Sequence, residues 1–129
     1  MPAMAMLHEK DPKEVVLEAL GDISDFEVWK NQVLCAVYER PQKTRSGLLL
    51  ADSTRDEDKF QGKVGLVVKL GPSAFVDDGS WSFQHAAAVG DWVFFRTSDS
   101  RAITVNGKLC RLIDDVDIAG RVQDPDQVW

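Results

Sequence analysis

The sequence predicts a small, mainly β protein: a β-barrel with one short α-helix near the N-terminus. From about residue 26 onward, apolar residues recur with period two and are rich in β-branched and aromatic types. The predicted strands are short, closely spaced and separated by glycine-rich turns, which is typical of small barrels. A chain of 129 residues suits one domain with its own hydrophobic core.

The helix is expected directly after residue 10. Asp11 can act as the N-cap, Pro12 suits the first helical position, and Glu14 stands where a capping box has an acid. Apolar residues follow, and Gly21 marks the end of the helix. A helix of about two to three turns is not stable alone, so we expect it to dock on this chain or on a neighbour.

The strands are predicted from apolar runs that end at turn residues. Asn106-Gly107 is a strong hairpin signal, because both central positions of a type I′ turn favour positive φ. Asp77-Asp78-Gly79 predicts a second hairpin between aromatic segments. The expected strands are residues 33–38, 62–70, 92–95, 101–105 and 108–113, with a final short strand or turn within 114–122.

Composition excludes several classes of partner. The net charge is −6 and no basic stripe is present, so nucleic acids are poor partners. No apolar run approaches the ~20 residues that span a bilayer, and no signal peptide is visible. We therefore expect a cytoplasmic protein that binds neither nucleic acid nor membrane. Cys35 and Cys110 lie in apolar runs and are expected to be buried free thiols.

No catalytic or metal-binding constellation emerges from the sequence. His8 and His85 are isolated, and neither lies at metal-ligand spacing from a cysteine. Carboxylate runs such as Asp114-Asp115 are typical of solvated faces. The phosphate-binding and nucleophile motifs of common enzyme classes are missing. We therefore expect no enzymatic activity, no cofactor and no metal.

An apolar island interrupts the polar stretch of residues 41–61. It consists of Gly47 followed by Leu48, Leu49 and Leu50. One interpretation is an extra core strand flanked by long turns. The other is a mobile loop whose leucines become ordered in the groove of a partner. A loop of roughly twenty residues is uncommon unless it is functional, which favours partner binding.

In their order, these features resemble the GroES co-chaperonin family. Gly47-Leu48-Leu49-Leu50 matches the glycine and aliphatic triplet that family members press into the apical groove of a chaperonin. Residues 62–71 are similar to the family's glycine-rich second strand, and residues 89–95 match its V-G-D-x-V-x-F motif. Residues 108–119 are similar to its C-terminal ending. The resemblance covers about residues 28–122.

The resemblance implies a domain organisation. Residues 1–27 form an N-terminal extension with the short helix, residues 28–122 form the GroES-like barrel, and residues 123–129 form a C-terminal tail. Within the barrel it implies a chaperonin-binding loop at about 41–61 and a roof hairpin at about 72–88. The roof residues are Phe75, Asp78, Gly79, Trp81 and Phe83.

The resemblance implies a co-chaperonin that caps the chamber of a GroEL-type chaperonin and assists protein folding. The extension, the tail and the apolar roof depart from the usual pattern and resemble phage-encoded relatives, which act in the host cytoplasm on capsid protein. The alternative is a virion structural protein, a head decoration or cement protein, that binds capsid protein. Both imply a homo-oligomeric ring, of seven subunits by analogy. The apolar first and last strands are expected to pair between neighbours.

Overall fold

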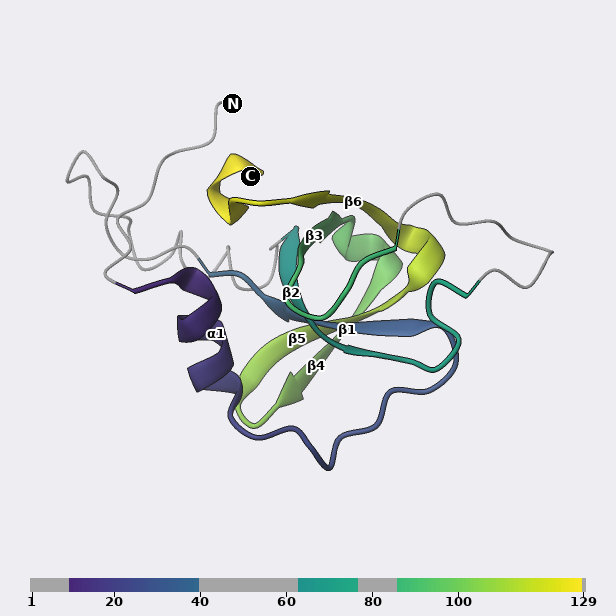
Figure 1. The fold of residues 1–129 in the computed structure, drawn as a ribbon, viewed down its shortest axis with the longest axis horizontal. Coiled ribbons are helices and arrows are strands. Elements are labelled where there is room, and N and C mark those ends of the chain that lie inside the picture. The colour runs from purple at the N-terminus through teal and green to yellow at the C-terminus, as the bar shows by residue number, and fades with distance from the viewer. Residues whose placement is uncertain (1–9, 40–62, 77–85, 129) are drawn as a thin grey trace.

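The computed structural model describes residues 10–39, 63–76 and 86–128 (Figure 1). Within these ranges, six antiparallel strands form one sheet in the order β4-β5-β1-β2-β3-β6, and one α-helix precedes them. The mainly β fold with a short N-terminal helix is thus confirmed. The elements are α1 (Pro12–Leu20), β1 (Gln32–Val37), β2 (Val64–Leu70), β3 (Trp92–Phe95), β4 (Ser100–Val105), β5 (Lys108–Asp114) and β6 (Ile118–Val122).

Two short connections require the sheet to curl. β3 and β4 are four places apart in the sheet, about 19 Å if the sheet were flat. Yet they are joined through Arg96 and the 3₁₀ turn Thr97–Asp99, and a 3₁₀ turn rises only about 2 Å per residue. The 3₁₀ turn Asp115–Asp117 likewise joins β5 to β6, which are also four places apart. Both connections are possible only if the two edges of the sheet approach each other, as in the predicted barrel (Figure 1).

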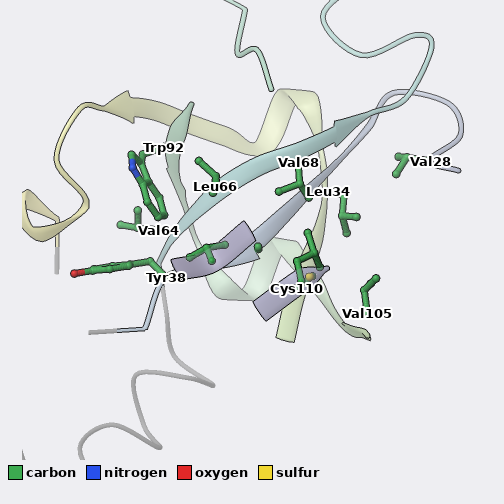
Figure 2. Close-up of a cluster of buried hydrophobic side chains, with 12 residues drawn as sticks. Val28, Leu34, Tyr38, Val64, Leu66, Val68, Trp92, Val105 and Cys110 are labelled. Atoms are coloured by element: carbon green, nitrogen blue, oxygen red, sulfur yellow. The ribbon is translucent and has the colours of Figure 1, made fainter. Parts of the chain in front are cut away.

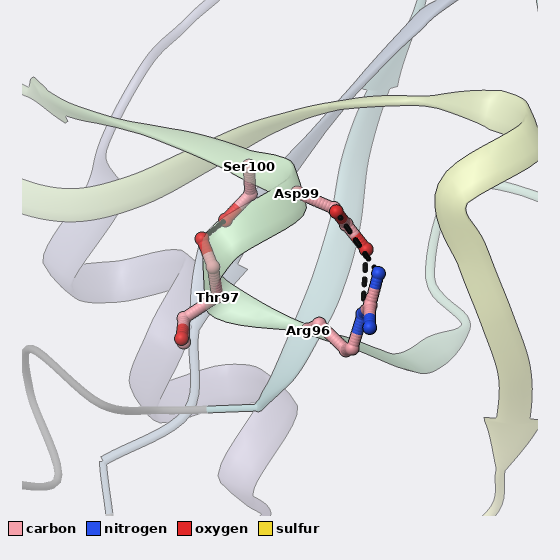
Figure 3. Close-up of polar contacts among 4 residues, drawn as sticks. All are labelled: Arg96, Thr97, Asp99 and Ser100. Carbon is pink, nitrogen blue, oxygen red and sulfur yellow. Dashed lines mark hydrogen bonds and ion pairs between the residues drawn. The ribbon is translucent and has the colours of Figure 1, made fainter.

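The turn between β3 and β4 is held by its own polar side chains (Figure 3). Arg96 Nε donates to Asp99 Oδ2 at 2.9 Å, and Arg96 Nη2 donates to Asp99 Oδ1 at 3.4 Å. The Ser100 hydroxyl donates to the Thr97 carbonyl at 2.9 Å. These contacts lie where the chain changes direction between β3 and β4.

Helix α1 begins and ends as predicted. The Asp11 carboxylate accepts from the Lys13 N–H at 3.0 Å, and the Gly21 N–H donates to the Leu17 carbonyl at 3.0 Å. The helix docks on its own chain, because Val16 and Leu20 are buried against the sheet. The Asn106 side chain also donates to the Leu20 carbonyl at 2.9 Å, so the β4–β5 turn holds the C-terminal end of the helix.

Strand β1 lies in the middle of the sheet and pairs with β2 on one side and β5 on the other. Its residues 33–37 are completely buried. The expectation that the first strand pairs with a neighbouring subunit is therefore wrong, since both of its edges are already hydrogen-bonded within the chain. The last strand, β6, does lie at an edge of the sheet, beside β3.

Both faces of the central strands are buried, in two separate clusters. Successive strand residues point to opposite faces, so Leu34 and Ala36 enter one cluster while Val33 and Cys35 enter the other. The first cluster, shown in Figure 2, also receives Val16 and Leu20 of α1. Because both faces are buried, the sequences of these strands are nearly continuous apolar runs.

The two cysteines are buried free thiols, as predicted. Cys110 pairs in register with Ala36, and Cys35 pairs with Arg111. The two sulfurs belong to different clusters on opposite faces, which explains why these neighbouring cysteines remain unbridged. Burial raises the pKa of Cys110 to about 11 and raises the pKa of Cys35 as well.

Two turns contain residues with positive φ, and one of these turns is formed by the V-G-D motif. Asn106 and Gly107 have φ of 51° and 80°, which confirms the predicted hairpin. Gly90 has φ of 98°, and the following Asp91 accepts from the Ala88 N–H at 2.9 Å. Residues 114–122 are predicted to contain a short strand or a turn, and they contain both: a 3₁₀ turn followed by strand β6. In the described ranges no helix is long and apolar enough to cross a membrane.

Candidate partner-binding site

The predicted binding residues Gly47, Leu48, Leu49 and Leu50 lie outside the described residues, but both ends of the segment that carries them are described. β1 ends at Val37 and β2 begins at Val64, and these strands are antiparallel neighbours. The Tyr38 N–H donates to the Val64 carbonyl at 3.0 Å. The two ends of the 40–62 segment therefore start from adjacent points of the sheet, and we call the described residues at these points the loop root: Tyr38, Glu39, Lys63 and Val64.

The β1 side of the loop root is fixed by Tyr38. Its side chain is 2% exposed, and its hydroxyl donates a hydrogen bond to the Asp126 carboxylate. The Tyr38 ring packs edge-on against Trp92, with centroids 5.4 Å apart and planes at 71° (Figure 2). Edge-to-face pairs of this kind add about 0.5–1.5 kcal/mol to the burial itself. The next residue, Glu39, lies 3.6 Å from Lys108 Nζ.

The β2 side of the loop root is fixed through the backbone. The Phe95 N–H donates to the Lys63 carbonyl at 3.0 Å, which attaches the start of β2 to the end of β3. Gly65 allows close strand contact, since a Cβ there would lie only 2.8 Å from the Cβ of Cys35. The loop root is thus held by hydrogen bonds and packing from β1, β2, β3 and the C-terminal tail.

A second set of contacts lies at the other end of β1, where the predicted roof begins. Asp115 is buried, and its Oδ1 accepts from the Asn31 side chain at 2.8 Å. Its Oδ2 accepts from the Phe75 N–H at 2.9 Å. The Phe75 side chain is half-buried and packs against the second cluster. The other predicted roof residues, Asp78, Gly79, Trp81 and Phe83, lie outside the described residues.

Asp115 corrects one interpretation of the sequence. We expected the Asp114-Asp115 run to lie on a solvated face, and this is wrong for Asp115, which is 4% exposed. Its partners Asn31 and Phe75 are 84 and 40 positions away along the chain, so no local pattern marks them. The same holds for Asp126 and Tyr38, which are separated by 88 positions.

His85 and His8 lie outside the described residues. Within the ranges that the structure does describe, no three His, Cys, Asp or Glu residues gather into a group that could hold a metal ion. What the described part of the site provides is a fixed root for an intervening segment of chain.

The fold and the loop root define a small β-barrel of the co-chaperonin type, in which a long segment joins two central strands. Over residues 26–122 the chain matches the family model described as the chaperonin 10 Kd subunit, and it therefore belongs to this family, that of the GroES co-chaperonins. No curated protein matches the chain. Membership of the family implies a GroEL-type chaperonin as partner and a ring-shaped oligomer. Helix α1 and the C-terminal tail lie outside the matched residues.

Proposed function

We propose that this protein is a non-enzymatic co-chaperonin that caps a GroEL-type chaperonin chamber through Gly47, Leu48, Leu49 and Leu50. Membership of the chaperonin 10 Kd subunit family supports the partner. The observation that carries the proposal is the loop root, which fixes both ends of residues 40–62 at adjacent points of the sheet. In the same proposal Phe75, Asp78, Gly79, Trp81 and Phe83 belong to the roof of the cap.

The leucines supply the binding energy in this mechanism. Apolar area removed from water contributes about 25 cal/mol per Å², so three leucines entering one groove provide a specific anchor. Ordering the segment on binding opposes this gain, and a single copy therefore binds weakly. A ring multiplies the effect, because each bound loop holds the next at high effective concentration near its site. A ring of seven follows from the family analogy.

A capsid role is the second candidate. Helix α1 lies outside the residues matched by the family, and its Val15 and Leu17 are about half exposed, at 49% and 50%. Because these residues are two apart in the helix they lie on different sides of it, and each exposes an apolar side chain that a head decoration or cement protein could place against capsid protein. Under this candidate the protein is found in virions, whereas the co-chaperonin acts in the cytoplasm, on capsid protein if the gene is phage-encoded.

Replacing Leu48, Leu49 and Leu50 together by Ser tests the proposal. We expect the variant to keep its unfolding temperature and its oligomeric mass but to lose binding to a bacterial GroEL-type ring in the presence of nucleotide. The matched control replaces Val15 and Leu17 by Ser, which removes exposed apolar side chains from α1 and should leave ring binding intact. An unfolded triple variant would contradict the proposal, because it would place the leucines in the core. Loss of capsid association in the control alone would favour the second candidate.

A further inference from the structure

The C-terminal tail is folded onto the sheet beyond the residues that the family model matches. After β6 the chain forms the 3₁₀ turn Pro125–Gln127. Asp124 caps this turn, since its Oδ1 accepts from the Asp126 N–H at 3.0 Å and its carbonyl accepts from the Gln127 N–H at 3.0 Å. Val128 then packs against the first cluster. The tail therefore has a defined position relative to the sheet.

The tail places a carboxylate in the interior, beside the loop root. Asp126 is 7% exposed, and its Oδ1 accepts the hydrogen bond from the Tyr38 hydroxyl. A carboxylate is costly to bury unless it is hydrogen-bonded, so Asp126 and Tyr38 stabilise each other's position. Tyr38 in turn packs on Trp92 at the start of β3. The tail, the end of β1 and the start of β3 are thus connected through one side chain.

The contact between Asp126 and Tyr38 lies directly before residues 40–62 begin. Tyr38 is the last buried residue before the segment, and its N–H pairs with the first residue of β2. The side chain of the next residue, Glu39, forms an ion pair with Lys108 at 3.6 Å. A root that is already ordered leaves fewer residues to be ordered on binding, and each residue ordered costs about 1–2 kcal/mol.

We propose that Asp126 is a positioning residue for partner binding: by holding Tyr38, the C-terminal tail orders the loop root and so raises the affinity of the leucine segment for the chaperonin. This inference rests on the proposed function. If one root residue is not ordered in the free protein, it must be ordered on binding. The dissociation constant of a single loop should then rise about tenfold. A stabilising contact without this role would change the unfolding temperature but not the dissociation constant.

The test compares Tyr38→Phe, Asp126→Asn and the double variant with Asp115→Asn. Asp115 is the matched control, because it is a buried carboxylate whose partners lie at the opposite end of β1. The dissociation constant for a GroEL-type ring is measured well below the unfolding temperature, together with the amide exchange rates of Tyr38 and Phe95 in the free protein. We expect each root variant to weaken ring binding by at least about tenfold, because the loss in each loop compounds over the ring, and to speed exchange at both amides. The double variant should lose little more than either single variant.

Asp115→Asn should lower the unfolding temperature while leaving the dissociation constant and both exchange rates unchanged. Unchanged binding in the two root variants, despite lower unfolding temperatures, overturns the inference. If Asp126→Asn does not fold, the dissociation constant and exchange rates of Tyr38→Phe, which removes only a hydroxyl, test the inference alone. If the wild type itself binds no ring, the proposed function fails, and the exchange rates still decide whether Asp126 orders the loop root.

Discussion

Arg121 Nη1 of the edge strand β6 lies 3.1 Å from Asp91 Oδ2, in the turn that precedes β3. The same carboxylate oxygen accepts from the Ala88 N–H. The aspartate of the V-G-D motif therefore both closes its own turn and attaches the last strand of the sheet. Partial burial works against ionisation of Asp91, but these hydrogen bonds outweigh it and lower the pKa of the carboxyl.

Asp91→Asn should lose about 1 kcal/mol of unfolding free energy at neutral pH, because the charge-assisted hydrogen bonds are lost. A lowered pKa in the folded state stabilises the protein above the ordinary carboxyl value of about 3.9. That stabilisation disappears as the pH falls through the folded value. Urea unfolding of wild type and variant from pH 7 to pH 2 should show the difference shrinking toward the acid end.

Asp99→Asn is the control for this prediction. The Arg96–Asp99 pair in Figure 3 is also an arginine–aspartate contact, but the Arg96 side chain is 79% exposed. We expect a smaller loss of unfolding free energy than for Asp91→Asn, because an ion pair this exposed is screened by water. Equal losses for the two variants would contradict a special role of Asp91.

Gly71→Ala should destabilise the fold by about 2–3 kcal/mol. A Cβ at this position would lie 2.3 Å from the Lys30 carbonyl oxygen and 2.9 Å from the Trp29 carbonyl oxygen. Both obstacles are backbone atoms, so no side-chain rotation relieves the clash. Gly107→Ala is the matched control, since it has open space around a Cβ and only a positive φ of 80°. Its expected loss is about 1 kcal/mol, and a loss as large as that of Gly71→Ala would contradict the steric account.

Asn106→Gly should loosen α1 without opening the β4–β5 hairpin. Glycine retains the positive φ of the turn but removes the amide that donates to the carbonyls of Leu20 and Asp22. We expect a loss of about 1 kcal/mol and faster amide exchange in α1. Faster exchange in β4 and β5 as well would show that the asparagine serves the hairpin rather than the helix.

Cys35 and Cys110 should not react with a thiol reagent such as dithionitrobenzoate in the native protein at pH 8. Both are buried, and burial raises their pKa values, that of Cys110 to about 11. The reactive thiolate is therefore scarce as well as inaccessible. In denaturant both thiols should react. One fast equivalent under native conditions would contradict the burial of that cysteine.

Local signals were sufficient for most of the fold. The Asp11 cap, the Gly21 stop and the Asn106-Gly107 turn are each decided by neighbouring residues, and each occurs where the sequence predicts it. The sheet order could not be predicted this way, because no local pattern places β1 between β2 and β5. Asp115 and Asp126 were missed for the same reason, since a carboxylate is buried only when a distant partner such as Asn31 or Tyr38 satisfies it.

The leucine segment is predicted from composition and length. Three leucines within a polar stretch fit either a partner-binding segment or an extra core strand, and the length of the stretch favours binding. The structure adds the loop root, which the sequence could not predict because Tyr38, Trp92 and Asp126 come together only in the folded barrel. The partner-binding residues themselves remain a prediction.

The native mass of the wild-type assembly, measured with and without a GroEL-type ring and nucleotide, tests the central claim most directly. We predict a ring-shaped oligomer alone and, with chaperonin and nucleotide, a complex whose mass is the sum of the two rings. Leu48, Leu49 and Leu50 replaced by Ser should leave the first mass and abolish the second. A wild-type protein that never shifts to the mass of the complex would contradict a co-chaperonin function.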